Sequence, residues 1–454
     1  MKLSMIVTVL AATFSLTAAD VIASDVDTPK KEYLKVMRSE LSKNEPGAAA
    51  LVSQDGEVLF KKAIGRANLE LNVPLKAKSV FKIGSITKQF TAAAIMILHE
   101  RGKLSVYDDI HKYIPDFPTE GHVVTIEQLL THTSGIANYT EDHDLMLKEA
   151  TAPATLDEII TRFAQHPMKF QPGDEMAYSN TGYVLLGKII EVASGQSYAE
   201  FINEHIFQKL GMKNSHYAGR QIIKNHASGY DMSADGYVNT IHIDTSWPHA
   251  AGALSSNVFD LNAWYHALAN EKLISKESYQ QMLAPVTLND GRVSTYGYGI
   301  AVSTLGDYQV ITHNGGINGF LSDALYVPEE GLYVAVLANN TDINPQLLSQ
   351  RLTARALDID MPSFKEVTLD DAQLKAFEGQ YSMQSGATYG VMYSQGELYF
   401  HRGNENYQEL VAMSSDSFFF EGNNVYIKFT DNEGQLILNE YINFSSTPHT
   451  GVKH

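Results

Sequence analysis

Strand-forming segments lie near both ends of the first 356 residues, and a long stretch with helical patterning separates them. Residues 47–65, GAAALVSQDGEVLFKKAIG, contain two apolar runs joined by an Asp-Gly pair, which predicts a β-hairpin. Three more strand-like runs lie between residues 307 and 340, and helices are expected at 31–43 and near 346–356. The most economical arrangement is an α+β fold, in which terminal helices cover an antiparallel sheet and a helical region is inserted between its two halves.

Three capping boxes support the helical assignment of the inserted region. In each, a Ser or Thr is followed three positions later by Glu or Gln and then by apolar residues at helical spacing. They are Thr125 with Gln128, Thr155 with Glu158, and Ser197 with Glu200.

The pattern changes after about residue 362. Apolar and polar residues alternate over short runs, with turn residues every eight to twelve positions. This alternation is typical of a small antiparallel β-barrel or sandwich of seven or eight strands. We therefore expect a main domain at 24–357, a linker near 358–364 and a small β-barrel domain at 365–454.

Residues 1–23 have the pattern of a secretory signal peptide, with Lys2 before an apolar stretch that is too short for a membrane-spanning helix. The chain has no cysteine, which excludes disulfides and thiolate metal sites. Its 34 basic and 52 acidic residues give a net charge of −18, which argues against a nucleic-acid or anionic-membrane partner. We expect an exported protein, periplasmic or secreted, that does not insert stably into a membrane.

The pattern Ser-x-x-Lys occurs twice in SVFKIGSITKQF, as Ser79 with Lys82 and as Ser85 with Lys88. Residues three apart share a face on a helix but point to opposite faces on a strand. Only the second pair precedes apolar residues at helical spacing, whereas the residues between Ser79 and Lys82 favour extended chain. Burial and the helix dipole disfavour a charged ammonium, so Lys88 could accept the proton of Ser85. From this local pattern alone, an N-capping serine with a solvent-directed lysine is the alternative.

A serine of this kind needs a second proton-handling group and a donor for the substrate. Tyr178 and Asn180 form a Tyr-x-Asn motif in a turn before a helical pattern. The same motif begins at Tyr237, in an irregular stretch, and at Tyr441, in a predicted C-terminal strand, so its setting has to distinguish the three.

The third group of candidate residues ends a predicted strand. His313 is followed by Asn314, Gly315 and Gly316, where missing side chains would let a substrate lie against the strand edge. His401 also begins a His-x-Gly motif, but within the C-terminal module. For His313 alone, a structural histidine at a strand end is an equal alternative.

In chain order, Ser85-x-x-Lys88, Tyr178-x-Asn180 and His313-x-Gly315 resemble the three motifs of the serine β-lactamase and penicillin-binding-protein superfamily. The resemblance is to the branch of class C β-lactamases, D,D-carboxypeptidases, D-aminopeptidases and related esterases. It covers about residues 30–356 and includes LLTHTSGI, FQPGDEMAYSN and GALSSNVFDL. The C-terminal module resembles the lipocalin-like appendages of some members.

The resemblance implies catalysis through an acyl-enzyme. Ser85 would attack a carbonyl while Lys88 and Tyr178 pass its proton, and water would then hydrolyse the acyl-enzyme. The backbone N–H groups of Ser85 and Gly316 would form the oxyanion hole, and Asn180 would bind the substrate amide and Lys88. If the Lys88 ammonium persists, the pKa of Tyr178 should be lowered.

The sequence departs from class C β-lactamases at His313, where these enzymes typically carry the lysine of Lys-Thr-Gly. We therefore expect acylation by penicillins with slow turnover or none. Histidine at this position is similar to the peptidase and D-aminopeptidase members, so the expected reaction is cleavage of amide bonds in small peptides. The alternatives are a carboxylesterase for short acyl esters, a weak β-lactamase, and a non-catalytic scaffold whose β module holds a ligand.

The resemblance implies no cofactor, and the expected partner is a small-molecule or peptide substrate. The acidic loop EDHDL at 141–145 could suggest a metal ligand, although such loops are usually solvated. No H-E-x-x-H and no G-x-S-x-G motif occurs, which removes the zincin and α/β-hydrolase interpretations.

Overall fold

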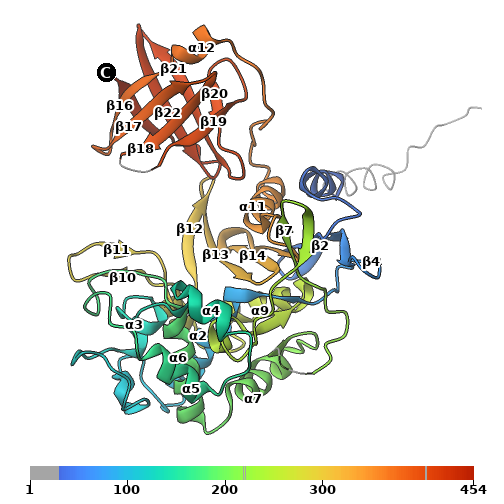
Figure 1. Ribbon diagram of the computed structural model, residues 1–454, viewed down its shortest axis with the longest axis vertical. Coiled ribbons are helices and arrows are strands. Elements are labelled where there is room, and N and C mark those ends of the chain that lie inside the picture. Colours follow the sequence, from blue (N-terminus) through green and yellow to red (C-terminus); the bar gives the residue numbers. More distant parts are fainter. Residues whose placement is uncertain (1–29, 218, 220, 404–405) are drawn as a thin grey trace, which may run out of the picture.

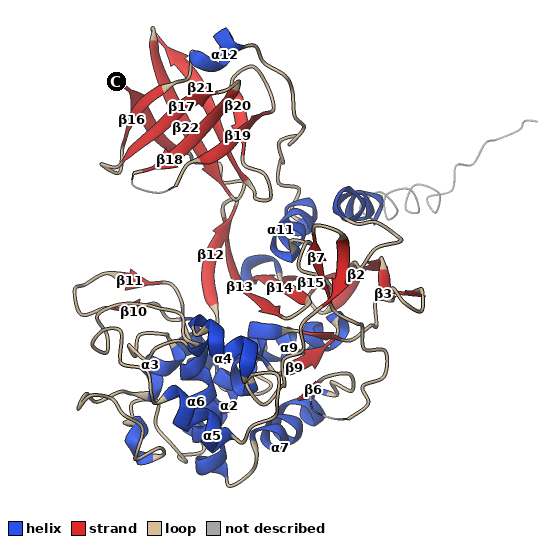
Figure 2. Cartoon of the chain, in the orientation of Figure 1, coloured by secondary structure: helices blue, strands red, loops and turns tan. Residues whose placement is uncertain are grey.

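The structure is a computed structural model that describes residues 30–217, 219, 221–403 and 406–454. The predicted signal peptide at 1–23 lies outside the described residues. A larger body of sheet and helices forms one end of the molecule, and a β-barrel forms the other end (Figures 1 and 2). In the described part of the chain, no helix is long and apolar enough to cross a membrane.

Six antiparallel strands form the main sheet, in the order β12-β13-β14-β15-β1-β2. The N-terminal hairpin pairs with β15 from Ala48 opposite Ala338 to Gln54 opposite Leu332. The predicted sheet built from both ends of the main body is therefore confirmed. The strands are β1 (Ala48–Gln54), β2 (Glu57–Ile64), β12 (Ala301–Leu305), β13 (Tyr308–Ile317), β14 (Phe320–Val327) and β15 (Leu332–Ala338).

The sheet is covered on both faces, and β15 shows why its sequence is apolar throughout. Tyr333, Ala335 and Leu337 contribute to the core beneath the sheet, whereas Val334 and Val336 face the helices on the other side. Alternate residues of a strand point to opposite faces, so a strand buried on both faces has no polar positions. The covering helices are residues 30–40 and α11 (Pro345–Ala356) on one face, with α9 (Val258–Ala269) on the other.

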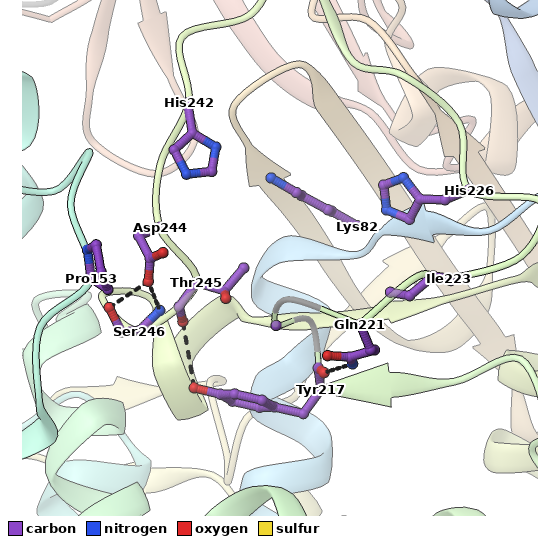
Figure 3. A pocket seen from close by; sticks show the side chains of 11 residues that line it. Lys82, Pro153, Tyr217, Gln221, Ile223, His226, His242, Asp244, Thr245 and Ser246 are labelled. Atoms are coloured by element: carbon purple, nitrogen blue, oxygen red, sulfur yellow. Dashed lines mark hydrogen bonds between the residues drawn. The ribbon is translucent and has the colours of Figure 1, made fainter.

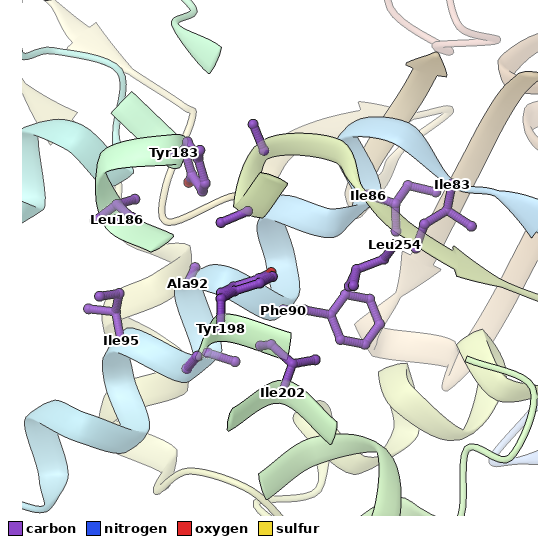
Figure 4. Packing of buried hydrophobic residues seen from close by; sticks show 14 of the residues in the cluster. Ile83, Ile86, Phe90, Ala92, Ile95, Tyr183, Leu186, Tyr198, Ile202 and Leu254 are labelled. Atoms are coloured by element: carbon purple, nitrogen blue, oxygen red, sulfur yellow. The ribbon is translucent and has the colours of Figure 1, made fainter. Parts of the chain in front are cut away.

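The inserted helical region packs around α2 (Thr87–Glu100), whose residues are buried from Thr87 to Leu98. Figure 4 shows side chains of α2 in one buried cluster with residues from later helices, among them Tyr183 and Tyr198. All three predicted capping boxes are present with both hydrogen bonds. The other helices here are α3 (Ile126–Leu130), α4 (His143–Lys148), α5 (Leu156–Phe163), α6 (Asn180–Ser194), α7 (Tyr198–Ile202), α8 (His249–Gly252) and α10 (Lys276–Leu283).

Short strands connect this region to the main sheet. β5 (Phe81–Lys82), β9 (Leu254–Ser256) and β6 (His216–Tyr217) form a small antiparallel sheet directly before the Ser85 segment. The remaining short strands pair as β3 (Arg66–Asn68) with β4 (Val73–Pro74), β7 (Tyr230–Ser233) with β8 (Gly236–Asn239), and β10 (Val286–Thr287) with β11 (Val293–Ser294).

The C-terminal module is a closed antiparallel barrel of eight strands, preceded by α12 (Asp371–Lys375). Apolar side chains such as Tyr381, Phe418 and Phe429 fill its core. The strands are β16 (Gly379–Met383), β17 (Thr388–Ser394), β18 (Glu397–Arg402), β19 (Gln408–Ala412), β20 (Ser417–Phe419), β21 (Val425–Asn432), β22 (Gln435–Ile442) and β23 (His449–Lys453).

Candidate active site

Ser85 lies in a short 3₁₀ turn, Gly84–Ile86, that leads directly into α2. Lys88 occupies the first turn of that helix and is fully buried, whereas Ser85 is partly exposed. The two side chains share one face of the turn, and Lys88 Nζ lies 3.1 Å from Ser85 Oγ. The structure thus brings together the Ser-x-x-Lys pair that the helical pattern selected.

Lys88 Nζ has three oxygen partners, and burial of the amine, rather than the identity of these partners, favours its neutral form. Nζ donates to Asn180 Oδ1 and to the carbonyl of Ala251, both at 2.8 Å, and these two oxygens can only accept. The Ser85 hydroxyl is the remaining partner and can itself donate. Burial lowers the pKa of Lys88 well below its ordinary value. A neutral lysine in this position is suited to take the Ser85 proton.

Tyr178 lies against this pair, but its pKa moves in the direction opposite to the expected one. Its ring centroid is 4.7 Å from Lys88 Nζ. Burial raises the pKa of Tyr178 above its ordinary value, and a hydrogen bond with Ser85 opposes this only in part. The expected lowering required a persistent Lys88 ammonium, and desolvation disfavours that charge. Tyr178 is therefore a protonated phenol at neutral pH, able to relay a proton but not to act as a phenolate base.

Asn180 is the first residue of α6, and hydrogen bonds at both its amide oxygen and its amide nitrogen fix the orientation of its side chain. Its Nδ2 donates to Asn138 Oδ1 at 3.3 Å, which leaves Oδ1 to accept from Lys88. Asn180 N also donates to Asn138 Oδ1, at 3.1 Å. Asn138, which sequence reasoning did not identify, thus sets which end of the Asn180 amide faces the lysine.

His313 lies on β13, is buried, and faces Tyr178 across a distance of 6.3 Å between ring centroids. Nδ1 donates to the carbonyl of Asn314, so Nε2 accepts from the Tyr296 hydroxyl at 2.8 Å. Burial lowers the pKa of His313 to about 4. The side chain is therefore neutral near pH 7, unlike a lysine at the same position.

The glycines of β13 allow its backbone to contact the turn that carries Ser85. A Cβ at Gly315 would overlap the carbonyl oxygen of Ile83, and a Cβ at Gly84 would lie 2.7 Å from Gly316 N. Pairing between β12 and β13 ends at Ala301 opposite Thr312, so this edge of β13 has no partner from residue 313 onward among the described strands. Gly316 thus lies beside the Ser85 turn and next to an open strand edge.

His132 and Tyr296 complete the site, and sequence reasoning assigned neither of them a role. The backbone of His132 accepts from Ala177 N at 2.9 Å and its Nδ1 accepts from Ser179 N at 3.1 Å, so His132 holds the residues on both sides of Tyr178. Its ring centroid is 4.2 Å from that of Tyr178. His132 lies within the LLTHTSGI signature, whereas no local pattern marks Tyr296.

The competing motif matches lie elsewhere. Ser79 Oγ accepts from Lys76 N at 3.0 Å and so closes a turn, while Lys82 is on β5. Tyr237 is on β8, and Tyr441 and His401 are on barrel strands.

The acidic loop at 141–145 has a structural explanation. Asp142 caps α4 through Leu145 N, Glu141 pairs with Lys169, and Asp144 pairs with Lys148 at 3.0 Å. Within the described ranges, no group of three or more His, Asp or Glu side chains is placed to hold a metal ion.

Fold and site together define a serine hydrolase of the β-lactamase and penicillin-binding-protein type. The β-lactamase family model matches residues 23–358, and the chain belongs to this family. Among curated proteins, penicillin-binding protein 4* of Bacillus subtilis is 28% identical over 433 residues, covering 88% of this chain and 94% of the relative.

Solved structures extend the similarity to the barrel. An octameric penicillin-binding protein homologue from Pyrococcus abyssi is 28% identical with a TM-score of 0.65, covering 96% of this chain and all of that chain. A D-stereospecific amidohydrolase from Streptomyces is 25% identical with a TM-score of 0.63, covering 72% of this chain and 97% of that one.

Proposed function

We propose that this protein is an exported hydrolase that cleaves amide bonds of small peptides or aminoacyl amides through an acyl-enzyme on Ser85. The observation that carries the proposal is the set of Lys88 partners. Two acceptors use two N–H groups of a desolvated amine, and Ser85 Oγ lies 3.1 Å from the same nitrogen. The proposed catalytic residues are Ser85, Lys88 and Tyr178.

In the acylation step, the Ser85 proton passes to Lys88 Nζ as Oγ attacks the substrate carbonyl carbon. The carbonyl oxygen becomes an oxyanion that accepts from the backbone N–H groups of Ser85 and Gly316. The C–N bond then breaks, while Tyr178 donates its proton to the leaving nitrogen and is reprotonated by Lys88. Amine is released, and the acyl group remains on Ser85 as an ester.

In deacylation, Lys88 again accepts a proton and then passes it on. Water donates its proton to the neutral amine of Lys88 as its oxygen attacks the ester carbon, and the same two N–H groups bind the oxyanion. The C–O bond to Ser85 breaks, and Oγ regains a proton from Lys88. This step releases the carboxylic acid and restores the starting site.

Substrate choice within this reaction rests on β13. The strand edge left free beyond Thr312 can pair with an extended substrate. His313 is neutral with both ring nitrogens in hydrogen bonds, so it supplies no fixed cation for a substrate's terminal carboxylate. We therefore place aminoacyl amides before D-Ala-D-Ala peptides, and the amidohydrolase from Streptomyces supports D-configured substrates.

A parallel assay tests the proposal. D- and L-aminoacyl amides, D-Ala-D-Ala peptides, nitrocefin and short p-nitrophenyl esters are compared on the wild type and on Ser85→Ala. We expect amide hydrolysis that Ser85→Ala abolishes, and slow nitrocefin turnover or none. Ester hydrolysis without amide hydrolysis would replace the proposed substrate class with carboxyl esters, and nitrocefin turnover near the ester rate would contradict the role given to His313.

A further inference from the structure

A cavity of about 860 Å³ lies on the segment that leads into Ser85. Its lining comes from β5, from the end of β6 and from loops around residues 223–226 and 242–246, and it includes none of the proposed catalytic residues. Volumes of this size hold small molecules or substantial parts of them. The proposed acylation chemistry leaves the cavity unused.

Lys82 is the basic side chain in the lining of this cavity. It is partly buried, and its Nζ lies 5.9 Å from the centroid of the Phe320 ring. No hydrogen bond or ion pair joins Nζ to another described residue, although burial lowers the pKa of Lys82 and thus disfavours its charge. A partly buried ammonium without a hydrogen-bonded partner is a suitable site for an anion.

Two histidines and a threonine line the cavity together with this lysine. Figure 3 shows Lys82, His226 and His242 lining the same space, with Thr245 at its edge. His226 is neutral near pH 7, since burial and the nearby Lys82 lower its pKa to about 4, and a backbone hydrogen bond with Ala227 opposes this only in part.

Asp244 is the acidic side chain in the lining, and its hydrogen bonds are directed away from Lys82. Oδ1 accepts from Ser246 N at 3.0 Å and from Ser246 Oγ at 2.7 Å. Its charge raises the pKa of Lys82 and so opposes the effect of burial. Asp244 thus helps to keep the lysine charged without occupying its N–H groups.

The cavity is lined by a residue that lies close to Ser85 along the chain. Lys82 precedes Ser85 by three residues, and three residues of extended chain span about 11 Å at most. A substituent a few bonds from the reacting carbonyl could therefore enter the cavity.

We propose that this cavity selects substrates whose acyl portion carries a carboxylate, with Lys82 as the cation that pairs with it. The proposal rests on the proposed function and adds a substrate class to it. It also gives different roles to the lysines of the two Ser-x-x-Lys pairs, because Lys88 would act on every substrate and Lys82 only on anionic ones.

Paired substrates test the proposal. D-glutamyl and D-glutaminyl p-nitroanilides differ only in a carboxylate and its neutral amide, and p-nitrophenyl esters replace them if the protein cleaves esters alone. We expect the wild type to prefer the glutamyl compound about tenfold in kcat/KM, and Lys82→Met to remove this preference with little change for the glutaminyl compound.

Lys78→Met, at an exposed lysine of the same segment, is the matched control and should keep the preference. Circular dichroism and thermal melting check the fold of each variant. A wild type without preference, or a Lys82→Met variant that retains it, would overturn the proposal.

A binding measurement separates this proposal from the proposed function. In the Ser85→Ala background, calorimetry compares D-glutamate with D-glutamine, in the presence and absence of Lys82→Met. We expect D-glutamate to bind at least fivefold more tightly, and Lys82→Met to abolish the difference. Equal binding of the two ligands would contradict the carboxylate site even if amide hydrolysis is observed, and selective binding without hydrolysis would contradict only the proposed function.

Discussion

Lys88 illustrates how burial can assign a chemical role to a residue. Its position in the first turn of α2 removes water from the amine, while Asn180 and Ala251 still accept two hydrogen bonds. Desolvation favours the neutral form, and Ser85 is the third polar contact of Nζ. The same burial keeps Tyr178 protonated, so the two groups differ in role although both are desolvated.

Ser85→Ala and Lys88→Ala should each reduce kcat/KM for a neutral substrate by about 10²–10⁴-fold or more, because general-base catalysis contributes about that much. The double variant should lose little beyond either single variant, since members of one catalytic unit are not additive. Ser79→Ala and Lys82→Met are the matched controls and should change the rate less than about tenfold. Additive losses in the double variant would show that the two residues act separately.

His313 makes the acid stability of the protein pH-dependent. Its pKa is about 4 in the folded state and about 6.5 when unfolded, so the unfolded chain binds the proton first as the pH falls. Stability contributed by neutral His313 is therefore present above pH 6.5 and decreases down to about pH 4. Between pH 7 and pH 5 this amounts to about 2 kcal/mol. Urea unfolding at pH 7 and pH 5 measures this for wild type and His313→Asn. Between these two pH values, the free energy of unfolding of the variant should fall by about 2 kcal/mol less than that of the wild type. Equal decreases would contradict a buried neutral histidine.

At the scale of elements, the site depends on the contact between the Gly84–Ile86 turn and β13. Ser322 Oγ donates to the carbonyl of Ile83 at 2.9 Å and so connects β14 to the same turn. The missing side chains at Gly84 and Gly315 let the backbones meet. The positions of both proposed oxyanion donors thus depend on one backbone contact.

Gly315→Ala should displace β13 from the turn, because its Cβ would overlap the backbone of Ile83. We expect a loss of at least about 10²-fold in kcat, the size of effect seen when one oxyanion donor is removed. Gly182→Ala is the control, since its Cβ would make ordinary contacts of 3.5 Å or more. A Gly315→Ala variant with wild-type kcat would show that the contact does not position the oxyanion donors.

The elements that were predictable are those that short sequence patterns encode. The 47–65 hairpin, the three capping boxes and the Ser85 to Lys88 helical turn depend on neighbouring residues, and the structure contains each of them. Tyr296 reaches His313 only through tertiary packing, so no pattern around it could reveal that contact. The lowered pKa of Tyr178 was expected only if the Lys88 ammonium persists, and the sequence could not decide that condition because it does not show how completely a side chain is desolvated.

At the scale of the whole molecule, the barrel is attached to the main sheet through a shared core. Phe444 is buried among residues of β12, β14 and α11, and Gly306 N donates to the carbonyl of Asn443 at 2.7 Å. Arg351 Nε donates to Asn424 Oδ1 at 3.2 Å, from α11 to the barrel. The alternation after residue 362 predicted the strands but not this attachment, since it cannot show which barrel residue faces another domain. The division at 24–357 and 365–454 stays a prediction.

Phe444→Ala should lower the free energy of unfolding by about 3 kcal/mol, because removing a buried phenylalanine leaves a cavity. Urea unfolding followed by circular dichroism measures this loss. Leu71→Ala is the control, since Leu71 is 76% exposed and should change stability by less than about 0.5 kcal/mol. A loss for Phe444→Ala as small as that of the control would show that the barrel and the sheet do not share a core.

The central claim, that Ser85 is the acylated nucleophile, is tested most directly by locating a covalent adduct. The protein is mixed with a fluorophosphonate or benzylpenicillin, quenched in acid, digested and sequenced by mass spectrometry. We predict one adduct on Ser85, a much slower adduct in Lys88→Ala and none in Ser85→Ala. An adduct on Ser79, or no adduct with either reagent on folded protein, would contradict this account.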